Sequence, residues 1–138
     1  MVDLEQQLST VPLLAGLERR TRKRLSEVGK RRTYQADETI VKQGTTGTAL
    51  YIVLSGRATI VVNDQTVGEV SAGDFFGELA LIEEHPRSAT VTATSQTECL
   101  LFPAWEFTAL LDEHPEIAVP IMKALIGRLH RREGHKPA

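Results

Sequence analysis

A glycine, a carboxylate and an arginine lie close together in this 138-residue chain and could bind an anion. Gly77 and Glu78 precede a short apolar run, and Arg87 comes nine residues after Glu78. A turn that opens a helix leaves backbone N–H groups unpaired, and the helix dipole adds partial positive charge there. Arg87 adds a permanent cation whose planar fork fits two phosphate oxygens. Since Glu78 can accept hydrogen bonds, these residues predict a ligand with one phosphate beside a sugar hydroxyl.

The stretch 75–91 resembles the phosphate-binding cassette of the cyclic nucleotide-binding domain family. That family includes regulatory subunits of the cAMP-dependent kinase, catabolite activator proteins and cyclic nucleotide-gated channels. Its pattern is F-G-E-x-A-L, a few variable residues, and R-[STA]-A-[TS]-[VI]. The positions that match it are Phe76, Gly77, Glu78, Ala80, Leu81, Arg87, Ser88, Ala89, Thr90 and Val91. The resemblance covers nearly the whole chain, flanking helices included.

The resemblance implies that Arg87 binds the exocyclic oxygens of a cyclic phosphate, assisted by the Ser88 hydroxyl and the Ala89 N–H. Glu78 would accept a hydrogen bond from the ribose 2′-hydroxyl. Backbone N–H groups and room for close approach would come from Gly77, Leu79 and Ala80. Each residue also has a plain structural reading: Arg87 as a surface partner of a nearby glutamate, Glu78 as a helix-capping carboxylate, and Ser88 as a strand-edge serine.

The base should contact the wall of a β-roll and the last helix. Val70 and Phe75 are the expected wall contacts, with Leu79 and residues 60–62 as further candidates, although each could be a core residue. In the family, a residue of the final helix covers the base. Arg128 stands in the right region and could stack on a purine, although a solvated helix arginine is an equal interpretation. Other candidates there are Leu125, Ile126 and Leu129.

We expect cAMP as the ligand in preference to cGMP, and no cofactor. Family members that prefer cGMP often carry threonine directly after the cassette arginine, whereas this chain has Ser88.

Composition indicates a soluble globular domain. Hydrophobic residues make up 41% and charged residues 25% of the chain, and the net charge is −2, which gives no global attraction to nucleic acid. No apolar run approaches the length of a membrane span, and the N-terminus lacks the features of a signal peptide. Cys99 is the single cysteine, so no intrachain disulfide can form. We therefore expect a cytoplasmic protein.

The hydrophobic pattern predicts an α+β, mainly β fold. Residues 4–28 read as helical with a break at Val11-Pro12, and helices are expected again at 105–113 and 116–132. Short strands separated by glycine turns indicate an antiparallel β-roll, a jelly-roll-like barrel. The expected strands cover 31–35, 39–43, 50–54, 57–62, 67–70, 89–93 and 98–102. We expect one domain, 1–138, with an N-terminal helical segment (1–29), the roll (30–103) and C-terminal helices (104–133).

The leading functional hypothesis is a sensor that binds a cyclic nucleotide and signals by repositioning its C-terminal helix to an effector protein or fused domain. A homodimer is also among the expected assemblies. A catabolite-activator-type regulator is an alternative, but no recognition helix follows residue 133, so we expect no DNA binding by these residues alone. A barrel that has lost its ligand and serves only for interaction is a further alternative.

Enzymatic and metal-dependent functions are not expected. The four histidines have no metal-ligand spacing, which argues against a cupin-like metal enzyme. Cys99 lies in a β pattern with no base near it in sequence and is expected to be a small core residue. We therefore assign no catalytic residue and no metal ligand.

Overall fold

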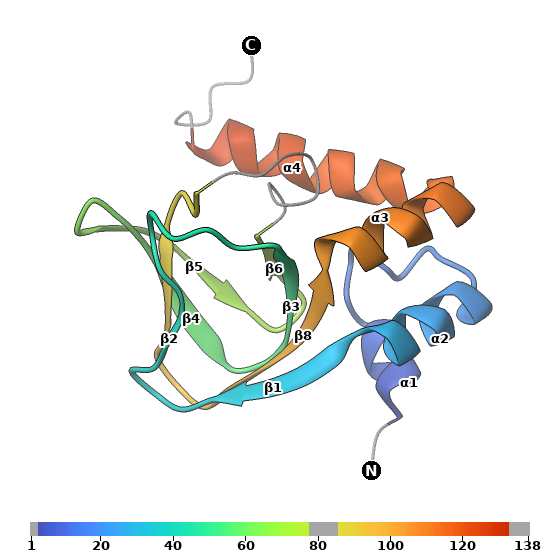
Figure 1. The fold of residues 1–138 in the computed structure, drawn as a ribbon, viewed down its shortest axis with the longest axis horizontal. Coiled ribbons are helices and arrows are strands. Elements are labelled where there is room, and N and C mark those ends of the chain that lie inside the picture. Colours follow the sequence, from blue (N-terminus) through green and yellow to red (C-terminus); the bar gives the residue numbers. More distant parts are fainter. Residues whose placement is uncertain (1–2, 78–85, 133–138) are drawn as a thin grey trace.

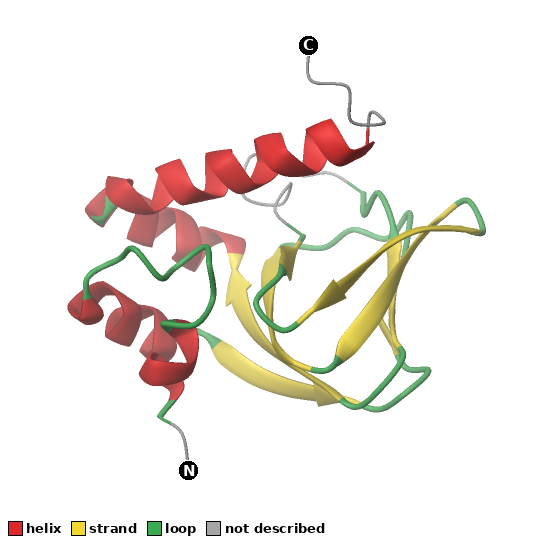
Figure 2. Cartoon of the chain, turned by 180° about the vertical axis from the view of Figure 1, so that it is seen from behind, coloured by secondary structure: helices red, strands yellow, loops and turns green. Residues whose placement is uncertain are grey.

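Two antiparallel sheets form a roll, and the helices gather on one side of it (Figures 1 and 2). The computed structural model describes residues 3–77 and 86–132, with side chains up to residue 127. One sheet has the order β1-β8-β3-β6 and consists of Lys30–Tyr34, Thr97–Pro103, Ala49–Ser55 and Phe75–Phe76. The other has the order β2-β7-β4-β5 and consists of Thr39–Val41, Thr90–Ala93, Arg57–Val62 and Gln65–Ser71. The predicted antiparallel roll is confirmed.

Strand β3 is buried from Leu50 to Leu54 because both of its faces are covered. Leu50 and Ile52 join the core that the helices pack on, whereas Tyr51 and Val53 face the interior of the roll. Alternate side chains of a strand point to opposite faces, so a continuous apolar run is what a doubly covered strand requires. The molecule therefore has two cores that share one sheet.

Asn63 and Asp64 form a tight hairpin turn. Asn63 has φ 49° and Asp64 has φ 66°, the left-handed values that a two-residue hairpin turn between twisted strands needs. The turn joins β4 to β5, and β5 begins two residues earlier than the pattern predicted.

The helical segments follow the sequence pattern, with one difference in the last of them. Helix α1 (Leu4–Leu8) and helix α2 (Arg19–Val28) are separated by an irregular connector, as the break at Val11-Pro12 predicted. Helix α3 (Ala104–Glu113) follows β8 directly. The expected single helix 116–132 is instead a 3₁₀ turn, η2 (Pro115–Ile117), followed by α4 (Ala118–Arg132). Pro115 occupies the first position of that turn, where its missing N–H costs nothing.

Trp105 does not pack between a helix and the roll. Its side chain stands on the surface at the first turn of α3, whereas Phe107 on the same helix is fully buried against Phe102. Within the described residues, no helix is long and apolar enough to cross a membrane.

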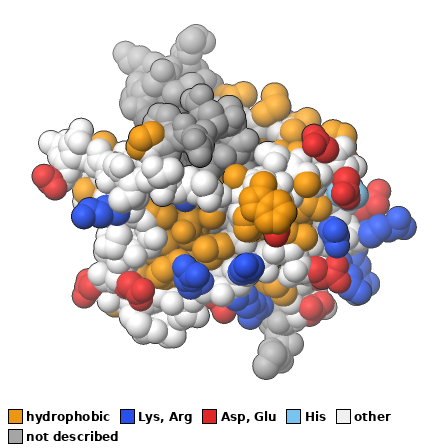
Figure 3. All heavy atoms as spheres, viewed as in Figure 1, with side chains coloured by type: hydrophobic (Ala, Val, Ile, Leu, Met, Phe, Trp, Pro, Cys, Tyr) orange, Lys and Arg blue, Asp and Glu red, His pale blue; other side chains and the backbone are white. Residues whose placement is uncertain are grey.

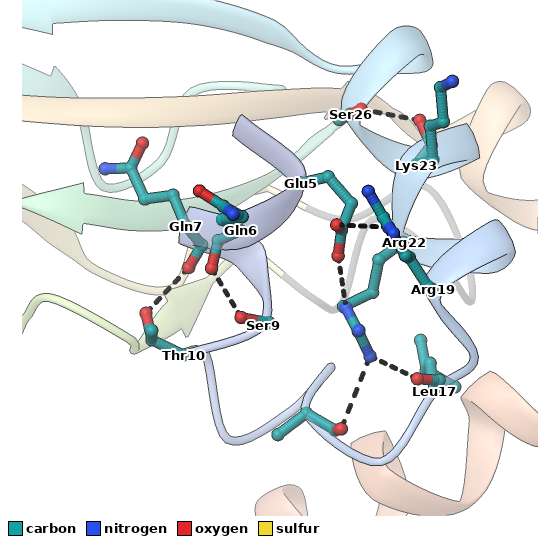
Figure 4. Close-up of polar contacts among 11 residues, drawn as sticks. Glu5, Gln6, Gln7, Ser9, Thr10, Leu17, Arg19, Arg22, Lys23 and Ser26 are labelled. Carbon is teal, nitrogen blue, oxygen red and sulfur yellow. Dashed lines mark hydrogen bonds and ion pairs between the residues drawn. The ribbon is translucent and has the colours of Figure 1, made fainter. Parts of the chain in front are cut away.

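A buried carboxylate ties the N-terminal helices together (Figure 4). Glu5 on α1 is 5% exposed and accepts hydrogen bonds from Arg22 Nε at 2.9 Å and Arg19 Nε at 3.2 Å, both on α2. Arg22 also donates to the carbonyl oxygen of Leu17. The Arg22 side chain is 14% exposed and that of Arg19 is 81% exposed. The Glu5–Arg22 pair is therefore shielded from water, and the Arg19 contact lies at the surface.

Glu5→Ala should lower the free energy of unfolding by about 3 kcal/mol, because it leaves the Arg22 cation buried without its carboxylate. Arg19→Ala should cost less than about 1 kcal/mol, since an exposed ion pair contributes little. Urea denaturation of the two variants measures the difference. Equal losses for both variants would contradict the account of this ion pair.

Candidate ligand-binding site

The backbone of Arg87 is fixed by the turn that precedes β3. The Arg87 N–H donates to the carbonyl oxygen of Thr45 at 2.7 Å, and the Gly44 N–H donates to the Arg87 carbonyl at 2.8 Å. Thr46 and Pro86 form a single antiparallel bridge beside them. Segments about forty residues apart in sequence thus hold the start of the arginine side chain in one position.

The Arg87 side chain runs inward along β3 and is half-buried. Its Nη2 donates to the carbonyl oxygen of Ala49 at 3.1 Å, and its Cζ lies 5.7 Å from the centre of the Tyr51 ring. The Tyr51 ring stacks on Phe76 with centroids 4.8 Å apart and planes 6° from parallel. A guanidinium over an aromatic face gains a cation–π attraction, so the stacked rings form a platform for the cation.

Two glycines make room for the guanidinium. A Cβ built on Gly47 would lie within 2.5 Å of Arg87 Cζ and Nη2, and one built on Gly77 would lie 2.8 Å from Arg87 Nη1. Gly77 also has φ 85°, a left-handed value that a residue with a side chain seldom adopts. The guanidinium therefore occupies a gap that any larger residue at either position would fill.

The charge and the N–H donors of Arg87 are suited to binding an anion. Within the described part of the chain, Ala49 is the one hydrogen-bond acceptor of its side chain, and no carboxylate pairs with it. A guanidinium carries five N–H donors, and among the described residues the Ala49 carbonyl is the one acceptor that they meet. Half-burial strengthens its attraction for an anion, because fewer water molecules screen the charge.

The structure places the other described candidates at different depths. Val70 is buried in the interior of the roll. Ala89 is half-buried and Ser88 is exposed, directly after Arg87. Of the earlier expectations, Glu78, Leu79 and Ala80 lie outside the described residues, and so does the side chain of Arg128. The backbone of residue 128 belongs to α4.

The structure does not place Phe75 at the wall of the roll, where it was expected to contact the base. It pairs with Ile52 and lies in the core beneath the helices, so its ring does not line the interior of the roll. Phe76 pairs with Tyr51 and takes that interior position. Adjacent strand residues point to opposite faces, so only one of two neighbouring phenylalanines can face the roll.

The sequence did not predict that Tyr51, Phe76 and Gly47 would lie around the Arg87 side chain. Tyr51 is hidden in an apolar run in which its hydroxyl is the one polar side-chain group. The contact of Gly47 with Arg87 depends on tertiary structure. The signal that could have found it is a second glycine, three residues after Gly44, just ahead of a buried strand.

The described residues offer little to nucleophilic or metal chemistry. Burial raises the pKa of the Cys99 thiol to about 12, and burial, with a contribution from Tyr51, raises the pKa of Tyr34 to about 12. Both groups face the interior of the roll and stay protonated at neutral pH. Among the described side chains, no cluster of histidine, cysteine, aspartate or glutamate could hold a metal ion.

Residues 31–114 match the family model described as the cyclic nucleotide-binding domain. Among curated proteins, a cyclic nucleotide-gated potassium channel from Rhizobium etli is 39% identical over 97 residues. That match covers 70% of this chain and 27% of the channel. The chain thus spans about a quarter of the length of this relative.

Solved structures agree with this assignment. The catabolite activator protein of Thermus thermophilus superimposes with a TM-score of 0.80 at 30% identity, over 88% of this chain and 60% of that one. The regulatory domain of Toxoplasma gondii PKA, in a co-crystal with cAMP, gives a TM-score of 0.77 at 28% identity, over 88% of this chain and 48% of that one. The matched range includes Gly47, Gly77 and Arg87 of the candidate site, and this chain belongs to the cyclic nucleotide-binding domain family.

Proposed function

We propose that this chain binds cAMP and acts as a regulatory sensor. The observation that carries the proposal is the position of the Arg87 guanidinium, which Ala49, Tyr51 and two glycines hold beside β3. A guanidinium held in this way is already arranged for two phosphate oxygens. Binding therefore costs less side-chain conformational entropy. That a cAMP-bound PKA regulatory domain has the same fold supports the choice of ligand.

The remaining contacts to the nucleotide are part of the proposal. The Ser88 hydroxyl and the Ala89 N–H would assist Arg87 at the phosphate. Glu78 would accept the 2′-hydroxyl of the ribose, and Gly77, Leu79 and Ala80 would contribute backbone N–H groups. Val70 and the Tyr51–Phe76 pair supply apolar surface inside the roll, and Arg128 remains the proposed cover for the base. Ser88 in place of threonine favours cAMP over cGMP.

The signal would leave the domain through α4. Ile117, just before α4, and Ile121 and Leu125 on it pack on the helix-side core. Val119, Met122 and Ile126 are more than half exposed and recur at helical spacing on another face. A ligand that prefers one position of α4 would change what this face offers to an effector, a fused domain or a second copy.

We also propose that residues 1–138 act as one domain without catalytic activity of their own. The inert Cys99 and Tyr34 groups support this, as does the regulatory nature of the family. The single cysteine fits a reducing compartment such as the cytoplasm.

Arg87→Ala should weaken cAMP binding about a hundredfold, and Arg87→Lys about tenfold, because lysine keeps the charge but lacks the planar fork. Titration calorimetry with cAMP measures both values. Adenosine, which has no phosphate, should bind the wild type and Arg87→Ala with equal affinity.

The control is Arg57→Ala, which removes an exposed arginine that pairs with Glu69. It should leave cAMP affinity unchanged. Wild-type protein that binds no cyclic nucleotide, or an Arg87→Ala variant with wild-type affinity, would refute the proposed function.

Gly47→Ala should weaken cAMP binding about tenfold with little change in stability, because the new methyl group displaces the end of a flexible arginine and no backbone. Gly68→Ala is the matched control, since its nearest neighbour would be Ile60 at 3.8 Å. In the Arg87→Ala background, Gly47→Ala should have no further effect on affinity. A tenfold loss that persists in that background would show that Gly47 acts by another route.

A further inference from the structure

Helices α2 and α3 border a groove that the nucleotide site does not use. Its volume is about 370 Å³, and it shares no residue with the Arg87 site. The residues that line it are Arg24, Glu27, Val28, Trp105, Glu106, Ala109, Leu110 and Glu113. On the face shown in Figure 3, hydrophobic side chains stand out near the start of α3, with acidic and basic side chains beside them.

Trp105 is the most exposed large hydrophobic side chain of the described residues, at 71%. The first turn of α3 presents the indole to solvent although buried positions lie close by on the same helix. Tryptophan is enriched in protein interfaces and at the residues that dominate binding energy there. An indole left in water beside a groove indicates a surface that a partner covers.

The charged residues that line the groove carry more negative than positive charge. Glu27, Glu106 and Glu113 face a single cation, Arg24, and none of these four has an ion-pair partner within the described residues. The excess of carboxylates attracts a cationic partner. The electron-rich face of an indole also favours a cation, and a guanidinium stacks on it well.

The lining also offers apolar contact. Leu110 belongs to the helix-side core, Val28 packs against that core, and Ala109 is exposed between the two helices. A groove of about 370 Å³ lies at the low end of the range for small-ligand sites, so it accommodates a few side chains of one segment and not a broad protein face.

We propose that the α2–α3 groove binds a basic peptide segment of a partner protein. An arginine or lysine of that segment lies against Trp105 and among Glu27, Glu106 and Glu113, and an adjacent apolar side chain rests on Val28 and Leu110. The partner thereby docks on the helices that flank the roll and leaves the nucleotide site open.

Trp105 is the chain's single tryptophan, so its fluorescence reports on the groove directly. The probes are a short amphipathic peptide of leucine, alanine and arginine, and the same peptide with glutamate in place of arginine. The basic peptide should shift the emission to shorter wavelength and saturate, and the acidic peptide should not. Raised salt should weaken the effect, because the attraction is partly electrostatic.

Substitutions identify the groove as the place of binding. Glu106→Gln and Glu113→Gln should each weaken the basic peptide about three- to tenfold. Glu116→Gln is the matched control, because Glu116 pairs with His114 outside the groove. All three variants should keep wild-type affinity for cAMP, so failure of this proposal is distinct from failure of the nucleotide site.

Equal binding of the two peptides, no binding of either, or full affinity in both groove variants would overturn the proposal. Sedimentation equilibrium provides one more test. If the protein alone dimerises and Glu106→Gln dissociates the dimer, a second copy and not a basic peptide occupies the groove, and the proposal is wrong.

Discussion

The fixed position of one guanidinium is the constraint on which the site depends. The Ala49 carbonyl, the Tyr51 ring and the gap between Gly47 and Gly77 together determine where the end of Arg87 lies. The backbone bonds between Arg87 and the Gly44–Thr45 turn hold the other end of the side chain. An arginine ordered before its ligand arrives loses less conformational entropy on binding, which strengthens its hold on an anion.

The site lies beside a strand that belongs to both cores. Strand β3 contributes Tyr51 to the interior of the roll and Ile52 to the core on which the helices pack, so one strand borders both regions. On the neighbouring strand, Phe76 faces the interior of the roll and Phe75 faces the core beneath the helices. Each residue of these two strands that faces the roll therefore adjoins one that faces the helices, which gives the proposed signal a short route through close-packed side chains.

The sequence predicted the fold well because the alternation of side chains and the glycine turns belong to local structure. It also singled out Arg87 and Gly77 as candidates, which lie in one short cassette and which the structure brings together. It did not predict which of two adjacent phenylalanines enters the roll, because that depends on the register of Phe76 against Tyr51. Nor did it predict the contact of Gly47 with Arg87, which joins segments forty residues apart. Local patterns carry no information on such long-range contacts.

A crystal structure of the chain with cAMP bound tests the central claim most directly. The account predicts two phosphate oxygens within about 3 Å of the Arg87 guanidinium nitrogens, with the bond from Arg87 to the Ala49 carbonyl retained. A nucleotide whose phosphate lies beyond hydrogen-bond reach of Arg87 would contradict it, as would an Arg87 side chain that leaves the gap between Gly47 and Gly77.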